Sequence, residues 1–262
     1  MIAEKKLAIL TFATNGFSSG SILKSVRRLI PAMRNTKLII TCSLDGTKEV
    51  HDKLRGVSGA YDRCLETFTQ LRAFKTVNAY LGVTVSKENH LDLPLLLSDL
   101  KKKIEGFRFD ETHFNFAQES FFYNNVGALP SGRVMDNEVY MSVQALRRIH
   151  KKNNKKFKDL LENRYFEFMP KYLTEKKAPL KCSALGGSCF IDPYGDIYPC
   201  MGFEAKIGNL SEAGYDLKEF WKLFFKRKDE VRKSIQEHKC PGCWTACEAY
   251  PSILNNLLLR PQ

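Results

Sequence analysis

The last third of the chain holds most of the cysteines, and this clustering limits the fold more than any other feature of the sequence. Six of the eight cysteines lie there: Cys182, Cys189, Cys200, Cys240, Cys243 and Cys247. In a reducing compartment, clustered cysteines are more often metal ligands than disulfides. The C-terminal third is therefore expected to fold around a metal centre. The other two, Cys42 and Cys64, lie in a predicted strand and on an apolar helix face, and both are expected in the core.

Four of the clustered cysteines form two pairs whose spacing can be interpreted. Cys182 and Cys200 flank a predicted hairpin over 188–203, so the ends of the hairpin bring them together. Cys240 and Cys243 have the spacing at which two thiolates bind one metal or cluster without backbone strain. Two such pairs suit a zinc ion held by four thiolates or an iron–sulfur cluster. The spacing alone does not choose between these two, but apolar and aromatic neighbours favour the cluster, which needs shielding from water: Phe190, Ile191, Tyr198 and Trp244.

The first 118 residues alternate between predicted strands and predicted helices. Strands are expected over 6–13, 37–46, 77–85 and 111–118, and helices over 21–33, 59–74 and 93–107. This alternation predicts an α/β fold with a parallel sheet and crossover helices. Polar turns end the first two strands, as TNG (14–16) and SLDG (43–46). They are expected at the carboxyl edge of the sheet, where α/β folds place their sites.

The pattern changes after residue 120. A loop is predicted over 121–136 and a long helical stretch over 137–175, followed by the cysteine-rich hairpin and two helices. Asp216 is expected to cap the first of these helices. We place the boundary near residue 178 and predict two domains, 1–177 and 178–262.

Charge and hydropathy exclude several classes of protein. The net charge of +12 is concentrated in two basic runs, 147–158 and 226–233, which we interpret as solvated helix faces. No basic patch interleaved with aromatic residues indicates a nucleic-acid partner. The N-terminal apolar run is too short for a membrane span and lacks a cleavage site. A cytoplasmic protein without a membrane span is therefore expected.

The C-terminal pattern resembles the SPASM/twitch extension of radical S-adenosylmethionine (radical SAM) enzymes. CSALGGSCFIDPYGDIYPC, then IGNL, a helix and CPGCWTAC, match the order of cysteines and glycine in that extension. The resemblance implies one auxiliary 4Fe–4S cluster bound by Cys182, Cys200, Cys240 and Cys243. Cys247 or Cys189 is expected to take the place of one of them if the ligand set differs. Zinc is the alternative metal.

The N-terminal part resembles the same family's TIM-type barrel from its second strand onward. Thr14, Asn15 and Gly16 look like the end of that second strand, and residues 43–56 look like the third strand and its loop. The resemblance implies that Ser43 and Arg55 contact the carboxylate and ribose end of S-adenosylmethionine (SAM), and that Thr14, Asn15 and Gly16 belong to the same cofactor-binding site. A hydroxyl and a guanidinium suit such a ligand. The expected fold is thus a partial (β/α) barrel lacking its first strand, followed by a small hairpin-and-helix domain.

The sequence departs from the family in one respect. It contains no C-x-x-x-C-x-x-C motif, which in radical SAM enzymes binds the cluster that cleaves SAM. We therefore expect a chain that starts just before the second strand of the barrel. Three hypotheses follow: a truncated radical SAM oxidoreductase or maturase, a piece of a split enzyme completed by a partner, or a non-catalytic iron–sulfur scaffold.

For an active enzyme, the resemblance implies reductive cleavage of SAM and a 5′-deoxyadenosyl radical that abstracts hydrogen from the substrate. The substrate is expected to be a peptide, a protein side chain or a small molecule, and the electron donor a ferredoxin or a flavodoxin. No catalytic residue is predicted from the sequence.

Overall fold

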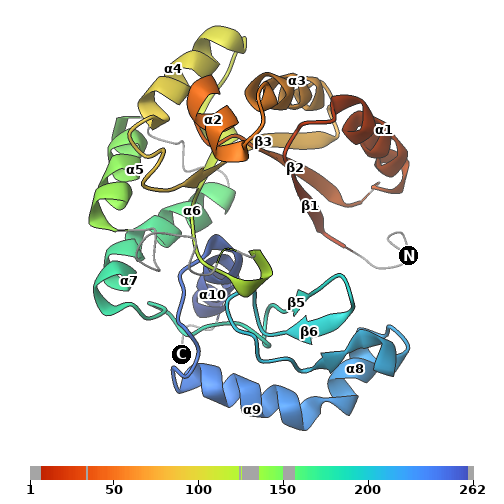
Figure 1. The fold of residues 1–262 in the computed structure, drawn as a ribbon. Helices are drawn as coiled ribbons and strands as arrows, with labels where there is room; N and C mark the ends of the chain where they lie inside the picture. The colour runs from red at the N-terminus through yellow and green to blue at the C-terminus, as the bar shows by residue number, and fades with distance from the viewer. Residues whose placement is uncertain (1–6, 34, 124, 126–135, 150–156, 259–262) are drawn as a thin grey trace. The chain divides into compact units, whose positions relative to one another are not determined.

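The computed structural model describes residues 7–258 apart from 34, 124, 126–135 and 150–156. The chain divides into two compact units (Figure 1). Unit 1 comprises residues 1–117 and 141–152, and unit 2 comprises residues 118–140 and 153–262. The predicted domain boundary near residue 178 lies inside unit 2 and stays a prediction.

Unit 1 is built on a four-stranded sheet whose strands follow the chain order β1-β2-β3-β4 and are all parallel. The strands are β1 (Ile9–Thr14), β2 (Lys37–Ser43), β3 (Val77–Val85) and β4 (Thr112–Phe116). The helices that connect them are α1 (Ser19–Leu29), α2 (Lys48–Arg55), α3 (Ala60–Arg72) and α4 (Leu93–Lys103). The predicted α/β class and the parallel sheet are confirmed, whereas the partial barrel stays a prediction.

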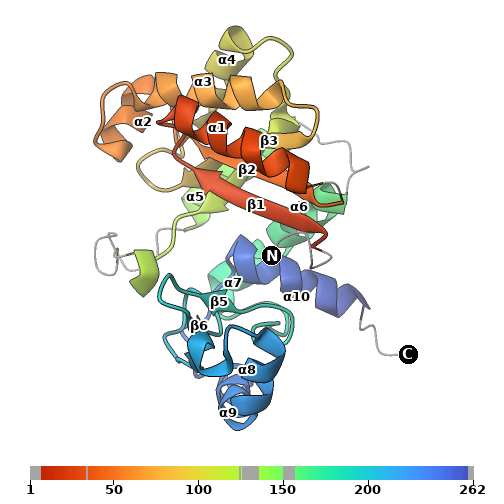
Figure 2. The ribbon, with the colours of Figure 1, turned by 90° about the vertical axis from the view of Figure 1, so that its right-hand side faces the viewer.

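The core of unit 1 lies between this sheet and α3. Helix α3 packs on β2 and β3 and contacts α1 and α2, and Figures 1 and 2 show these helices along the same face of the sheet. Strand β2 alternates buried and half-buried residues, as expected where one face of a strand meets a helix layer. Cys42 on β2 and Cys64 on α3 are both fully buried, so their predicted place in the core is confirmed.

Strand β1 is much more exposed than the other strands. Among the described residues it pairs with β2 alone, and most of its residues are exposed on both faces. Ile9 and Phe12 are 52% and 42% exposed. One edge of β1 is therefore unpaired within the described part of the chain.

Local chemistry explains where the observed helices differ from the predicted ones. The helix expected over 21–33 begins earlier, at Ser19, and its α-helical part ends at Leu29, because Pro31 has no backbone N–H for a helical bond and turns Ile30–Ala32 into a 3-10 helix. Residues 48–55 were expected in a loop, which is wrong: they form α2, which ends at Gly56 in the left-handed conformation. With eight residues and only two apolar side chains, Val50 and Leu54, this helix is shorter than the window over which apolar spacing indicates a helix.

The predicted helical stretch over 137–175 consists of three helices. They are α5 (Asn137–Ile149), α6 (Phe157–Glu167) and α7 (Met169–Glu175). Most of the predicted loop over 121–136 and of the first basic run lies outside the described residues. The second basic run lies on α9 (Phe225–Gln236), where Lys226, Arg227 and Lys233 are exposed, as predicted for a solvated helix face.

The C-terminal part of unit 2 contains a three-stranded antiparallel sheet and three helices. The strands are β5 (Phe190–Ile191), β6 (Asp196–Tyr198) and β7 (Gly208–Asn209), and the helices are α8 (Leu217–Leu223), α9 and α10 (Ala246–Leu258). The predicted hairpin turn is present, with the Asp192 carboxylate accepting bonds from the backbone of Tyr194 and Asp196. Asp216 caps α8 as predicted.

A small apolar core holds this C-terminal part together. It contains Ala184, Leu185, Ile197, Ile207, Phe220, Val231 and Ile235, with Cys182 and Cys240 packed against it. No helix in the described ranges is long and apolar enough to cross a membrane.

Candidate metal centre

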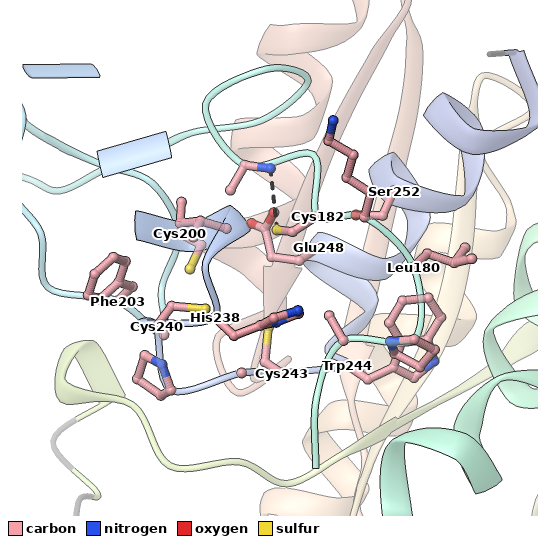
Figure 3. Close-up of a pocket in the computed structure, with 18 of the residues that line it drawn as sticks. Leu180, Cys182, Cys200, Phe203, His238, Cys240, Cys243, Trp244, Glu248 and Ser252 are labelled. Carbon is pink, nitrogen blue, oxygen red and sulfur yellow. Dashed lines mark hydrogen bonds between the residues drawn. The ribbon is translucent and has the colours of Figure 1, made fainter. Parts of the chain in front are cut away.

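Four cysteines of unit 2 line one cavity of about 450 Å³ (Figure 3). They are Cys182, Cys200, Cys240 and Cys243. The fold thus brings together two pairs of cysteines that are separated by about forty residues in the sequence. Among the described residues, no three His, Cys, Asp or Glu side chains lie close enough together to hold a single metal ion. The four thiols instead occupy the wall of a larger space.

Cys182 is positioned by a turn fastened to helix α10. The backbone N–H of Ser183 donates to the Ser252 hydroxyl at 3.0 Å, and the Ser183 hydroxyl donates to the Pro251 carbonyl at 3.3 Å. The N–H of Ala184 points at the Cys182 sulfur, 3.5 Å away. A sulfur atom held by a backbone donor is already oriented for a metal ligand.

Cys200 and Cys243 each have a backbone donor as well. Cys200 follows β6, forms an isolated bridge with Phe203, and its sulfur accepts a bond from the N–H of Gly202. The sulfur of Cys243 accepts a bond from the N–H of Thr245. Such bonds to the thiolate partly offset the cost of burying its charge.

The loop that carries Cys240 and Cys243 has a backbone conformation that requires glycine at one position. Gly242, between them, has a φ of +69°, and a Cβ there would lie 3.1 Å from the carbonyl oxygen of Lys176. Directly after the loop, Trp244 is 1% exposed, stacks on Tyr165 and donates from Nε1 to the Tyr165 carbonyl at 2.9 Å. The indole fixes the loop and supplies an apolar part of the cavity wall.

Burial dominates the electrostatics of the thiols. It raises the pKa of Cys200 and of Cys243 to about 12, and it also raises the pKa of Cys182. Neighbouring thiols act in the same direction, because each thiolate disfavours the next one. Without a metal these thiols are protonated at neutral pH, and a bound cation is what favours their thiolate forms.

Several polar side chains also line the cavity, and sequence reasoning missed two that lie next to the cysteine motif, Glu248 and His238. Glu248 on α10 accepts a bond from the Ser188 hydroxyl at 2.8 Å, and burial raises its pKa. His238 lies between α9 and Cys240. Their closeness to the cysteine motif in sequence was an available signal, but only the folded loop shows that both line the cavity.

The other two candidate ligands lie elsewhere. Cys189 and Cys247 are exposed, and neither is among the residues that line the cavity. Cys189 directly precedes β5, and Cys247 is in the first turn of α10. Their predicted role as substitute ligands stays a prediction.

Of the residues predicted to bind SAM, all but Arg55 lie at the carboxyl ends of β1 and β2 in unit 1: Thr14, Asn15, Gly16 and Ser43. Thr14 pairs with Cys42, so the ends of these neighbouring strands share one edge of the sheet. The Thr14 hydroxyl and the Asn15 side chain accept bonds from the backbone N–H groups of Gly16 and Phe17. Ser43 ends β2, and its carbonyl accepts a bond from the Cys64 thiol at 3.3 Å.

Arg55, the remaining predicted contact, is paired with an acidic residue. Its guanidinium lies 2.5 Å from a carboxylate oxygen of Asp45, which is 6% exposed. The other Asp45 oxygen accepts from the backbone N–H of Thr84 at 2.9 Å, and Asn89 donates to the Asp45 carbonyl at 2.6 Å. This network fastens the loop after β2 to the loop after β3, and sequence reasoning missed Asn89. The role of Arg55 toward SAM stays a prediction.

Comparison with known proteins identifies the class of the C-terminal part. Residues 182–247 match the family model of the SPASM iron–sulfur cluster-binding domain, a range that contains all four cysteines of the cavity. The predicted resemblance to radical SAM proteins with a SPASM domain is thereby confirmed, with relatives at low sequence identity.

Two curated relatives extend the similarity over most of the chain. One is the antilisterial bacteriocin subtilosin biosynthesis protein AlbA of Bacillus subtilis, 24% identical over 92% of this chain and 50% of its own length. The other is the AdoMet-dependent heme synthase of Methanosarcina barkeri, 24% identical over 78% of this chain and 61% of its own length. The chain thus spans about half the length of the first relative and under two thirds of the second.

Proposed function

We propose that unit 2 binds one auxiliary 4Fe–4S cluster through Cys182, Cys200, Cys240 and Cys243. The observation that carries this proposal is the cavity of about 450 Å³ with the four thiols on its wall. A zinc ion with four thiolates at about 2.3 Å draws the sulfur atoms together around a single atom. A cubane cluster needs a larger, shielded space, and the buried face of Trp244 is part of that shield.

We further propose that the chain is part of a radical SAM oxidoreductase or maturase. Both curated relatives support this, because one is named for bacteriocin biosynthesis and the other for AdoMet-dependent heme synthesis. In such an enzyme the reaction starts from reductive cleavage of SAM, and an auxiliary cluster supplies a one-electron centre. The bacteriocin relative aligns with more of this chain, so we place a peptide substrate first and a tetrapyrrole second.

One observation favours a second candidate, a non-catalytic iron–sulfur scaffold or partner subunit. The guanidinium of Arg55, which the enzyme reading assigns to SAM, is already paired with the buried carboxylate of Asp45. A structural ion pair at that position needs no SAM. A scaffold of this kind would bind the cluster but not SAM. A titration with SAM therefore distinguishes the two candidate functions.

The cluster is tested by iron and acid-labile sulfide analysis of the full chain after anaerobic purification. We expect about four iron and four sulfide per chain, because a 4Fe–4S cluster is held by four thiolates. Cys243→Ser is expected to lose most of both, since this sulfur lines the cavity. Cys189→Ser is the matched control, because this thiol is exposed and outside the lining.

Two results would contradict the proposal. Zinc without sulfide in the wild-type protein would show that the four cysteines hold a structural zinc ion and not a cluster. Equal loss of iron from both variants would show that the ligand set is not the four cavity cysteines.

A further inference from the structure

His238 lies at the end of α9, in a backbone conformation that normally selects glycine. Its φ is +56°. Its N–H bonds to the carbonyl of Ile235 at 3.1 Å, and the N–H of Lys239 bonds to the carbonyl of Ser234 at 2.9 Å. These two bonds form a Schellman motif, in which the left-handed position is usually glycine because a Cβ is unfavourable there. Histidine at this position therefore costs stability.

Three other non-glycine residues of the described chain share this conformation: Lys176, Leu185 and Tyr215. None of the three lines the cavity, whereas His238 does. Backbone strain at a residue that lines a cavity of candidate metal ligands indicates a functional role for its side chain.

The imidazole of His238 lies at the cavity that the four cysteines line. Figure 3 shows it with Cys240 and Cys243 among the side chains that line the cavity. Within the part of the chain that the structure describes, no hydrogen bond to the imidazole is formed by another residue, and the residue is exposed. An exposed ring at the wall of the cavity has an N–H free to donate to a sulfur atom inside it.

We propose that His238 donates a hydrogen bond from its imidazole to a sulfur atom of the auxiliary cluster and thereby raises the reduction potential of that cluster. The inference rests on the proposed cluster. Hydrogen bonds to the sulfur atoms stabilise the added negative charge of the reduced state, and they are among the main determinants of potential in iron–sulfur proteins. Four cysteines already supply the ligands, so the imidazole acts from outside the ligand set.

The test compares three variants of the full chain, purified without oxygen. His238→Gly removes the donor and relieves the backbone. His238→Asn keeps an N–H donor and tolerates the left-handed conformation. Tyr215→Gly is the matched control, because Tyr215 has a φ of 63° and is exposed but does not line the cavity. The readouts are the midpoint potential, from a redox titration followed by electron paramagnetic resonance, and the thermal unfolding temperature.

We expect both glycine variants to unfold at a higher temperature than the wild type. His238→Gly alone is expected to have a lower midpoint potential, and His238→Asn to stay closer to the wild type. An unchanged potential in His238→Gly, with normal iron content, would overturn the inference and leave the proposed cluster intact. Loss of iron from His238→Gly would also overturn it, because His238 would then be a ligand. A wild-type protein without sulfide would overturn both the proposed cluster and the proposed role of His238.

Discussion

Arg55 forms an ion pair with Asp45, and the resemblance to radical SAM enzymes assigns the same guanidinium to SAM. Asp45 is buried, and its second oxygen is held by the backbone of Thr84. Arg55 is about one third exposed, so its guanidinium is still accessible from solvent. A ligand carboxylate would therefore compete with Asp45 for the same guanidinium.

Calorimetric titration of the full chain with SAM is expected to separate these two roles. Arg55→Ala should weaken binding about tenfold or more, because a hydrogen bond to a charged group contributes about 1.5–3 kcal/mol. Asp45→Asn should strengthen binding, since it removes the competing charge and keeps an oxygen for the N–H of Thr84. Unchanged affinity for SAM in both variants would show that the ion pair of Arg55 and Asp45 serves the fold alone. No binding by the wild type would favour the scaffold.

The loop between β1 and α1 is the element whose geometry depends most clearly on a single glycine. Gly16 has a φ of +71°, and a Cβ there would lie 2.8 Å from the Cα of Cys64. Its carbonyl accepts a bond from the buried hydroxyl of Thr67 at 2.6 Å. The TNG turn is therefore pressed against the backbone of α3, which a substitution cannot easily displace.

Gly16→Ala is expected to destabilise the protein by more than about 1 kcal/mol, because both the positive φ and the close backbone contact oppose a Cβ. Gly20→Ala is the control: Gly20 lies in α1, and a Cβ there meets nothing within 4 Å. That change is expected to be neutral or to stabilise by up to about 1 kcal/mol. Urea unfolding followed by circular dichroism measures both, and equal stability of the two variants would contradict the predicted role of Gly16.

For the whole molecule, the division into two units leads us to expect that loss of the proposed metal centre affects unit 2 first. The four cavity cysteines belong to unit 2, whose C-terminal apolar core is small. Unit 1 has a parallel sheet and a core without any of these cysteines. Because metal binding and folding are coupled where a core is small, removal of the metal is expected to unfold the C-terminal part of unit 2 first.

Tryptophan fluorescence is suited to this test, because both tryptophans of the chain, Trp221 and Trp244, belong to unit 2. After anaerobic treatment with a chelator, the emission is expected to shift to longer wavelength as the buried Trp244 becomes exposed. Far-ultraviolet circular dichroism should retain the signal of unit 1. A cooperative loss of the fluorescence and circular dichroism signals would contradict the independence of the two units. No change in emission would show that the C-terminal part of unit 2 folds without the metal.

The sequence by itself determined what depends on local spacing. The alternation of short apolar runs predicted the parallel α/β unit, because helix and strand periods are properties of neighbouring residues. The two cysteine pairs indicated a metal centre for the same reason. Helix α2 was not predicted, because it has only eight residues and its apolar spacing rests on two of them, Val50 and Leu54.

The tertiary structure decided which distant groups meet. It placed four thiols from two segments around one cavity, left Cys189 and Cys247 outside its lining, and paired Arg55 with Asp45. It also placed His238, a residue without any motif, on the cavity wall. Such contacts arise from the packing of whole elements. The free energy that brings these residues together comes from burial of the surrounding apolar cores. No periodicity among neighbouring residues in the sequence therefore encodes them.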